Sequence, residues 1–393
     1  MKNSNISYKM LDPENCAMCG MCLNHCPTYK INNNESESPR GRISIIHGMN
    51  ESMLEPSHAA LKHINSCTLC MACESICPAK VDFYSLMTNA RNKYFKNQKF
   101  LFRLRTNLIS IFLTNHLLKK LISLIIIFFN RKFFLSFNNN ILKSMSYVQD
   151  YKKIDKIKSY SETEETIGIF LGCATDLFQK RVSNDLVNIL NKNNVSTELL
   201  TDIKCCGSLD YNNGRIEKGI KYNKETINKF NNKKYETVIG YASGCSAFIN
   251  KSKVKTNYQD ATSFVLNLLE TNKKNNFRIL KKNICVHKPC TTKLADINFQ
   301  KLINILKTIP GINIFTFEDE YCCGAGAQNL IHNPDNSRKI IDPKIEFLNN
   351  NNIDSLLTYN VGCSLNFINS INQSHNKNIQ VVHPITFLNN MLV

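Results

Sequence analysis

The sequence CAMCGMCLNHCP at residues 16–27 returns with the same cysteine spacing as CTLCMACESICP at residues 67–78. Each stretch is a C-x2-C-x2-C-x3-C-P run, which is the ligand pattern of a small module that holds two 4Fe-4S clusters. In such modules the first three cysteines of a run bind one cluster and the fourth binds the other. The spacing therefore predicts a first cysteine set and a second cysteine set. The first set is Cys16, Cys19, Cys22 and Cys77, and the second set is Cys67, Cys70, Cys73 and Cys26.

Structural zinc and disulfide bonds explain these two runs less well. Zinc sites usually space their ligands as separated pairs, and four cysteines satisfy one ion. The N-terminal residues lack the charged, apolar and small-residue sections of a secretory signal, so we expect a cytoplasmic, reducing location in which disulfides are rare. Two 4Fe-4S clusters are therefore the preferred interpretation.

The composition is that of a globular protein with a strongly basic balance. The 393 residues, 43% of them hydrophobic, are enough for two or three domains. Lys and Arg number 49 against 31 Asp and Glu, which gives a net charge of +18. This charge would suit nucleic acid or an anionic membrane. The lysines are scattered among asparagines and isoleucines, however, without a basic stripe that contains aromatic residues, so we expect no nucleic-acid site.

Residues 100–137 are rich in Leu, Ile and Phe but too interrupted to cross a membrane. A membrane-spanning helix needs about 20 apolar residues, and the longest uninterrupted apolar run here is Leu124–Phe129. The basic residues that bracket this run are Lys119, Lys120, Arg131 and Lys132. We expect amphipathic helices that pack within the protein or against a subunit. A helical hairpin docked on a partner or on the bilayer surface is the alternative.

The chain divides into a helical module and a longer part in which strands and helices alternate. The predicted strands of this longer part are 166–171, 196–200, 237–241, 283–287, 313–317, 355–359 and 380–382, and the first is followed by a predicted helix at 175–192. Such alternation predicts parallel sheets covered by helices. The predicted parts are a two-cluster ferredoxin-type domain at 1–97 with a closing helix at 85–96, an apolar helical connector at 98–146, a polar linker at 147–165, and two α/β domains at 166–275 and 280–393. The fold class is thus α+β and multidomain.

The two α/β domains share a cysteine pattern that indicates a duplication. Cys173 is followed after 31 residues by Cys205-Cys206-Gly207, and Cys290 is followed after 31 residues by Cys322-Cys323-Gly324. A Gly-Cys pair comes later in each half, ending at Cys245 and at Cys363. A repeat of this kind predicts two homologous halves, packed around a pseudo-twofold axis.

The repeated cysteines predict two further sites, one in each half. The N-terminal repeat set is Cys173, Cys205, Cys206 and Cys245, and the C-terminal repeat set is Cys290, Cys322, Cys323 and Cys363. Neighbouring glycines let the backbone approach a cluster closely and donate N–H groups to its sulfurs. Iron-sulfur clusters or metal ions are the preferred occupants, and redox-active thiols or buried structural cysteines are the alternatives.

Other residues carry weaker signals. Cys285 lies in a predicted strand and is expected to be a buried free thiol. His287 and His383 are candidates for ligation or for a structural role. No G-x-G-x-x-G motif follows a predicted strand, and the P-loop pattern is absent from the sequence, so we expect no FAD or NAD site on this chain.

The sequence around these cysteines resembles the iron-sulfur subunit of glycolate oxidase. The resemblance covers nearly the whole chain. It is carried by the segments at 26–29 (CPTY), 37–43 (ESPRGRI), 67–78, 287–290 (HKPC), 309–311 (IPG), 322–326 (CCGAG) and 382–384 (VHP). It implies an electron-transfer subunit in which the cysteines bind the clusters, while flavin-containing partner subunits oxidise glycolate to glyoxylate. The electrons would continue to a quinone or another membrane acceptor, from a cytoplasmic protein or one in peripheral contact with the inner face of the membrane.

Related cysteine patterns leave other functions open. Similar repeats occur in the corresponding component of anaerobic glycerol-3-phosphate dehydrogenase, in lactate-utilisation proteins and in heterodisulfide reductases, so another 2-hydroxy acid or a thiol-disulfide reductase activity is an alternative. The heterodisulfide type ends each repeat in C-x-x-C, whereas Phe248 and Asn366 stand at those positions here. Thr291 replaces a histidine that the family carries after the Pro-Cys pair. Each half thus keeps four candidate thiolates.

Overall fold

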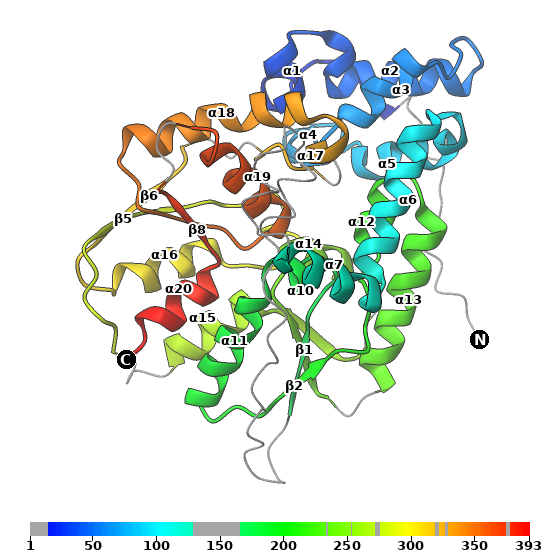
Figure 1. The fold of residues 1–393 in the computed structure, drawn as a ribbon. Coiled ribbons are helices and arrows are strands. Elements are labelled where there is room, and N and C mark those ends of the chain that lie inside the picture. Colours follow the sequence, from blue (N-terminus) through cyan, green and yellow to red (C-terminus); the bar gives the residue numbers. More distant parts are fainter. Residues whose placement is uncertain are drawn as a thin grey trace.

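The fold consists of a helical N-terminal module set against two α/β halves (Figure 1). The computed structural model describes residues 15–128, 166–232, 235–252, 254–271, 276–318, 322–326, 329–374 and 378–393. The predicted linker at 147–165 and the connector from residue 129 onward lie outside the described residues.

The N-terminal module is built from short helices with clear capping residues. Its α-helices are α1 (Pro27–Asn32), α2 (Pro39–Asn50), α3 (His58–Ser66), α4 (Ala72–Ser75) and α5 (Phe83–Lys93), with short 3₁₀ helices at Leu23–His25, Glu35–Glu37 and Phe95–Asn97. Ser57 caps α3 by accepting the N–H of Ala60. Asp82 likewise accepts the N–H of Ser85, so α5 begins two residues earlier than the predicted closing helix.

Two helices follow the module and cover the side of the first half. They are α6 (Phe100–Thr114) and α7 (His116–Phe128), and Asn115 separates them in extended conformation. None of the described helices is long and apolar enough to cross a membrane.

The two α/β halves have the same strand order, as expected for a duplication. The first half contains β1 (Ile167–Phe170), β2 (Thr197–Leu200), β3 (Thr237–Gly240) and β4 (Asn257–Asp260) in the order β2-β1-β3-β4. The second contains β5 (Lys282–Val286), β6 (Ile312–Thr316), β7 (Ser355–Leu357) and β8 (Gln380–Val382) in the order β6-β5-β7-β8. All neighbouring strands in both sheets are parallel. The predicted α/β fold of the repeats is therefore confirmed.

Helices cover both sheets. Those of the first half are α10 (Thr175–Phe178), α11 (Lys180–Lys192), α12 (Ser208–Asn212), α13 (Ile216–Asn232), α14 (Ser243–Ile249) and α15 (Ala261–Thr271). Those of the second half are α16 (Phe299–Lys307), α17 (Asn329–His332), α18 (Pro334–Asn350), α19 (Val361–Ile371) and α20 (Pro384–Met391).

Two details differ from the sequence-based expectation. The predicted helix at 175–192 is two helices, because Gln179 leaves the helical conformation and donates from its amide to Ser364 of the other half. Strand β4 was not predicted, because its sequence NYQD is polar and shows no apolar alternation.

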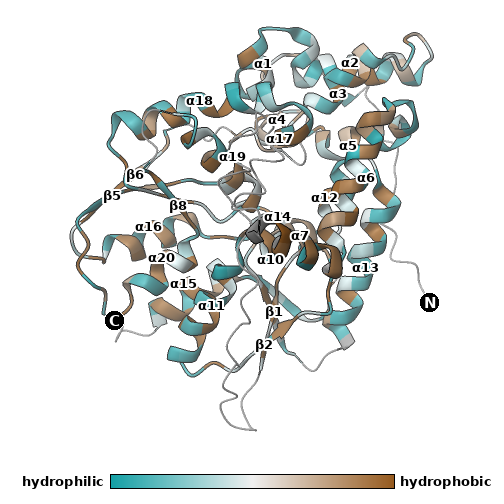
Figure 2. Cartoon of the chain, in the orientation of Figure 1, coloured by the Kyte–Doolittle hydropathy of each residue, from teal (hydrophilic) through white to brown (hydrophobic). Residues whose placement is uncertain are grey.

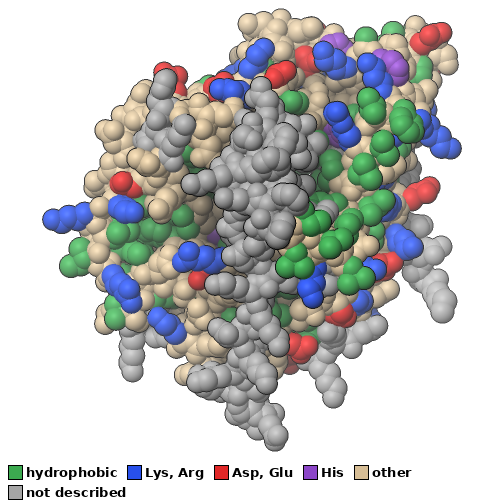
Figure 3. Space-filling model, in the orientation of Figure 1, with side chains coloured by type: hydrophobic (Ala, Val, Ile, Leu, Met, Phe, Trp, Pro, Cys, Tyr) green, Lys and Arg blue, Asp and Glu red, His purple; other side chains and the backbone are tan. Residues whose placement is uncertain are grey.

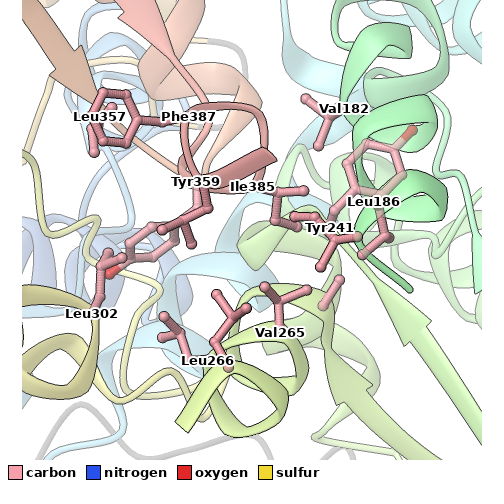
Figure 4. Close-up of a cluster of buried hydrophobic side chains, with 14 of the residues drawn as sticks. Val182, Leu186, Tyr241, Val265, Leu266, Leu302, Leu357, Tyr359, Ile385 and Phe387 are labelled. Atoms are coloured by element: carbon pink, nitrogen blue, oxygen red, sulfur yellow. The ribbon is translucent and has the colours of Figure 1, made fainter. Parts of the chain in front are cut away.

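The two halves share one hydrophobic core. Figure 4 shows side chains of both halves packed together, among them Leu186, Tyr241, Tyr359 and Ile385. Asp185 on α11 accepts hydrogen bonds from Thr386 (2.6 Å) and Asn389 (2.9 Å) of α20. The halves are thus held together by burial and by buried polar contacts, and the carboxyl ends of both sheets are kept close to each other.

Candidate metal centres

The second cysteine set surrounds one small cavity. Cys26, Cys67, Cys70 and Cys73 all line this cavity of about 20 Å³ beneath α2, although Cys26 is remote from the other three in the sequence. Burial raises the pKa of the Cys73 thiol, and the nearby Cys70, Cys67 and Cys26 raise it further. The structure thus brings the four cysteines of the second set together around one cavity.

The two cysteine runs adopt the same left-handed backbone at matching positions. Met18 (φ 52°) and Gly20 (φ 80°) flank Cys19, and Leu69 (φ 52°) and Met71 (φ 60°) flank Cys70. Left-handed conformations are unfavourable for residues with side chains and persist at functional sites. In the second run the Leu69 N–H donates to the Cys67 sulfur at 3.4 Å. Backbone that wraps a sulfur cluster and donates to its ligands fits these features.

The SPRGR segment at residues 38–42 links both cysteine runs. Ser38 caps α2 by accepting the Gly41 N–H (3.0 Å), and Pro39 occupies the first helical position. Gly41 is in contact with the Glu35 backbone, where a Cβ atom would clash. Arg40 donates to the Met18 carbonyl (3.0 Å) in the first run, and Arg42 approaches the Cys26 sulfur (3.9 Å) of the second set. The segment thus directs one arginine to each predicted cluster.

Two buried arginines lie beside the second set. Arg42 is 1% exposed and pairs with Glu37 at 2.7 Å. Burial lowers the pKa of Arg42, but Cys67, Cys26 and Glu37 outweigh this effect, so the pKa is raised. Arg91 donates to the Cys67 carbonyl (2.6 Å) and to the Asn212 carbonyl (2.9 Å) of the first half. Positive charge therefore surrounds this set on two sides, where it would stabilise an anionic cluster.

The first cysteine set lies nearer the surface. Cys19 is exposed, whereas Cys16, Cys22 and Cys77 are partly buried. Burial raises the pKa of Cys22, and Cys16 and Cys26 are close enough to raise it further. Met18 (42% exposed) and Met21 (52% exposed) lie beside Cys19. This end of the module is open to a partner.

The repeat cysteines lie at the carboxyl ends of the parallel strands. Cys173 follows β1 and Cys245 follows β3, the two neighbouring strands at which the chain order reverses; Cys290 and Cys363 follow β5 and β7 in the same way. Such switch points are where open α/β sheets bind their ligands. The Cys-Cys-Gly motifs arrive from the loops after β2 and β6.

Sulfur atoms approach one another within each repeat set. The Cys173 and Cys205 sulfurs are 3.5 Å apart in the N-terminal set, and the Cys323 and Cys363 sulfurs are 2.9 Å apart in the C-terminal set. Contact with Cys205, together with burial, raises the pKa of Cys173 well above its usual value. Contact with Cys322 does the same for Cys290, which is exposed. These thiols remain protonated unless a metal binds, because a metal deprotonates its thiol ligands.

The glycines of the Cys-Cys-Gly motifs complete these sites. Gly207 (φ 89°) and Gly324 (φ 81°) both take the left-handed conformation that other residues disfavour. Their N–H groups donate to the sulfurs of Cys205 (3.4 Å) and Cys322 (3.3 Å). The duplication is therefore preserved in backbone conformation as well as in sequence.

All eight repeat cysteines line a single cavity of about 300 Å³. The other walls of this cavity come from α6, through Ile109, Phe112 and Leu113, and from the second cysteine run, through Thr68 and Leu69. Figure 2 shows hydrophobic ribbon along α7, next to the centre of the molecule. The two repeat sets therefore share one cavity between the halves.

The second cysteine set is in direct contact with the C-terminal repeat set. The Cys70 thiol hydrogen-bonds with Cys322, and this contact and burial raise the pKa of Cys70. Gly326 packs against the backbone of Thr68, and a Cβ atom there would lie 2.6 Å from the Thr68 Cα. The CCGAG loop thus needs a glycine to bring the two cysteine sets together.

The donor set fits iron-sulfur clusters in composition and placement. All seventeen cysteines are free thiols. Within the ranges that the structure describes, no three His, Cys, Asp or Glu side chains converge to hold a single metal ion. A 4Fe-4S cube is larger than one ion, and each of its thiolates binds a different iron, so its four ligands need not converge on a single point.

The two candidate histidines are structural. Burial lowers the pKa of His287 to about 3, and its ring packs on Phe317 and Phe367. His383 caps α20 by accepting the Ile385 N–H (3.2 Å), while its Nε2 donates to the Tyr241 carbonyl (3.0 Å) of the other half. Cys285 is fully buried in β5, as expected.

Sequence reasoning missed two residues that shape the site. Arg91 bridges the second cysteine run and the first half. It lies in a helix-forming segment, where nothing in the sequence indicated a contact with the cysteines. Asp260 is buried near Cys245 and accepts from Ser246 (2.7 Å) and from the Thr262 N–H (2.9 Å). Aligning the two halves would have found Asp260, because it precedes α15 at the end of β4 as His383 precedes α20 after β8.

Comparison with known proteins identifies the parts of the chain. Residues 12–81 match the 4Fe-4S dicluster domain, and residues 167–250 and 284–368 each match the cysteine-rich domain. The helical dicluster module and the duplicated cysteine-rich α/β domains predicted from the sequence are thereby confirmed.

Several curated proteins are similar to this chain. The probable glycolate oxidase iron-sulfur subunit of Bacillus subtilis is 25% identical over 388 residues, which cover 89% of this chain and 87% of that protein. The glycolate oxidase iron-sulfur subunit of Escherichia coli is 23% identical, with 88% of each chain covered. Lactate utilization protein A of Oceanobacillus iheyensis is 24% identical over 57% of this chain and 96% of its own length. The resemblance expected from the sequence is confirmed.

Proposed function

We propose that this chain is the iron-sulfur electron-transfer subunit of a complex that oxidises a 2-hydroxy acid. Similarity to glycolate oxidase iron-sulfur subunits over most of the chain supports glycolate as the substrate, oxidised to glyoxylate by flavin-containing partner subunits. When bound, the clusters would supply one-electron transfer. The chain itself holds the ligands in place, excludes water from them and sets the charge around them. The acceptor would be a quinone at the inner face of the membrane.

The observation that carries this proposal is the continuous arrangement of cysteine sets. The first set is open at the surface beside Met18 and Met21, where a partner has access. The second set is buried and meets the C-terminal repeat set through Cys70 and Cys322. The repeat sets then share one cavity. Electrons would therefore enter at the first set and leave from the repeats.

The first experiment counts iron and acid-labile sulfide per chain and records EPR spectra of the reduced protein. About eight irons per chain correspond to the ferredoxin-type pair alone, and a clearly higher count requires clusters in the repeat sets too. Stoichiometric zinc without sulfide would contradict the proposal. Changing Cys322 and Cys323 to Ser should lower the count only if the C-terminal repeat set binds iron.

The second experiment identifies the substrate. The chain is purified with its flavoprotein partners and assayed with glycolate, lactate and glycerol 3-phosphate, using a soluble dye and then a quinone as acceptor. The proposal expects glycolate to give the highest kcat/KM. The similarity to lactate utilization protein A makes lactate the second candidate, and a preference for it would keep the electron-transfer role while changing the substrate.

A thiol-disulfide reductase is the contrasting class of function. Catalytic thiols of that class need a lowered pKa, whereas Cys173 and Cys290 have raised pKa values. Changing Cys206 or Cys323 to Ser and measuring disulfide reduction separates the two functions. Loss of a measurable disulfide reductase activity in these variants would favour the reductase.

A further inference from the structure

The α6–α7 helix pair carries its apolar residues on the outside. We define its outer face as the exposed side chains Phe100, Leu101, Leu104, Leu108 and Ile111 of α6 and Leu117, Leu121, Leu124 and Ile125 of α7. Phe100 is 67% exposed and Leu117 is 77% exposed. Their spacing of three to four residues places them along one side of each helix. Figure 3 shows hydrophobic side chains gathered over this region.

Polar residues of the same helices point inward. Thr106, Ser110 and Lys119 are almost completely buried. Ser110 donates to Asp210 (2.9 Å), and Lys119 pairs with Asp176 (2.6 Å). Leu113, with Ile109 and Phe112 beside it, also packs inward. The pair therefore has a second apolar stripe that faces outward, whereas an ordinary surface helix presents polar residues there. Because these buried bonds hold both helices in this orientation, the outer face is exposed in the folded protein.

The charge around the outer face is positive. Between Asp82 and Asp150 the sequence contains no acidic residue. Lys96, Lys99, Arg105 and Lys120 are exposed on or beside the two helices. Helices that lie in a membrane interface combine a Leu- and Phe-rich face with flanking Lys and Arg, and anionic lipids strengthen their binding.

We propose that the outer face of the α6–α7 helix pair docks the protein on an anionic phospholipid surface. A transient protein partner is a poorer fit, because such interfaces are only about as apolar as the rest of a protein surface. At 15 and 13 residues, the helices lie on the bilayer and do not cross it. The inference deepens the proposed function by naming the surface that reaches the membrane, and it rests on that function only for the identity of the acceptor.

Docking would place the cysteine cavity next to the lipid. Ile109, Phe112 and Leu113 line the cavity from α6, the helix that carries half of the outer face. An apolar acceptor dissolved in the membrane would therefore approach the repeat sets through this helix pair.

Co-sedimentation of the full-length, cluster-loaded protein with phospholipid vesicles tests the proposal. One vesicle contains phosphatidylglycerol and phosphatidylcholine in equal amounts, and the other contains phosphatidylcholine alone. We expect binding to the anionic vesicle, and a loss of about 100-fold or more in the double variant Leu104→Glu, Leu117→Glu. Lys99→Gln and Arg105→Gln should each weaken binding about fivefold on the anionic vesicle only.

The matched control is the double variant Met53→Glu, Ile279→Glu, which makes the same charge change at residues 70% and 75% exposed elsewhere. It should bind like the unaltered protein. Iron content and EPR spectra verify that every variant is folded. Equal binding by the outer-face and control variants, or no binding to either vesicle by the unaltered protein, would overturn the proposal.

Two further readouts separate other occupants of the outer face. If Leu104→Glu, Leu117→Glu instead abolishes co-purification of the flavoprotein, or disperses a dimer seen by sedimentation velocity, the face belongs to a protein and the proposal is wrong. Electron transfer from the flavoprotein to a soluble dye is measured in the same samples. Loss of that transfer with vesicle binding intact would contradict the proposed function and leave the docking surface standing.

Discussion

Arg42 places a full positive charge inside the N-terminal module. Its guanidinium bonds to Glu37, Ser66 and the His63 carbonyl and approaches the Cys26 sulfur. Nearby positive charge and hydrogen bonds to the sulfurs stabilise the reduced, more negative form of an iron-sulfur cluster. The second set should therefore have a higher reduction potential than it would have without Arg42.

Replacing this charge tests the idea. In Arg42→Gln we expect a lower midpoint potential for the cluster of the second set and a loss of about 3 kcal/mol in unfolding free energy, because the buried Glu37 loses its guanidinium partner and keeps only His63 and Ser66. Potentiometric titration followed by EPR measures the first effect, and urea unfolding the second. Arg40→Gln is the control, since Arg40 is more exposed and contacts the first run. An unchanged second potential in Arg42→Gln would contradict this role.

Gly324 makes a second prediction at this scale. It is left-handed, and a Cβ atom would lie 2.5 Å from the Ser337 carbonyl oxygen. Gly324→Ala should therefore lose about 1–3 kcal/mol in unfolding free energy and reduce the iron content of the C-terminal repeat set. Gly48→Ala, within α2 and without positive φ, is the control and should be tolerated. Equal stability of the two variants would show that the left-handed turn is not required.

The candidate ligand residues could be named from the sequence, but their surroundings could not. Cysteine spacing is a local property of the sequence, so it revealed both the two cysteine runs and the duplicated Cys-Cys-Gly motifs. The pairing of Arg42 with Glu37, and the position of Arg91 against the first half, depend on tertiary packing that local patterns do not encode.

At the scale of elements, the ends of the strands decide where the chemistry lies. The strand that was missed, β4, is polar along its length, and only its equivalence to β8 would have predicted it. Asp260 at the end of β4 and His383 after β8 then perform the same task, since each accepts the N–H of the second residue of the following helix. The repeat thus preserved a capping geometry while the residue type changed.

The buried ion pair between α7 and α10 gives a prediction for an element. Lys119 and Asp176 have side chains 6% and 9% exposed. Asp176→Asn should weaken the attachment of α7 by about 3 kcal/mol or more, because the ammonium stays buried without its partner. Amide hydrogen exchange of α7 peptides measures this attachment. Asp342→Asn breaks an exposed pair with Arg338 and should cost less than about 1 kcal/mol; similar effects of the two changes would contradict the prediction.

At the scale of the whole molecule, the contact between the halves should respond to acid. Burial lowers the pKa of His383 to about 4, whereas an unfolded chain has a histidine pKa of about 6.5. As the pH falls below 6.5, His383 binds a proton in the unfolded chain but not in the folded one. The free energy of unfolding therefore decreases between pH 6.5 and pH 4 and is unaffected by this residue above pH 6.5. At about pH 5 the loss from this residue should be about 2 kcal/mol.

Urea unfolding at neutral pH and at about pH 5 measures this loss. His383→Asn keeps a capping residue but cannot take up the proton, so its stability should depend less on pH. His58→Gln changes an exposed histidine and should keep the original dependence. If His383→Asn also keeps it, the proton responsible lies elsewhere.

The overall arrangement was only partly predictable. Strand and helix alternation predicted two parallel sheets, and the repeat predicted that they are related. That all eight repeat cysteines line one cavity, and that Cys70 meets Cys322, follows from how the halves and the module pack, which no single segment specifies.

The hydrophobic core that spans both halves has a consequence for how this chain could have arisen and how it can be divided. Side chains from the two sheets occupy the same interior, so a gene encoding one repeat alone would make a protein with an uncovered apolar side. Such an ancestor would have needed to form a homodimer to cover this side, and fusion of two copies of its gene would have joined the two subunits in one chain. Cutting the present chain between residues 275 and 280 should accordingly yield two fragments that are soluble only when expressed together.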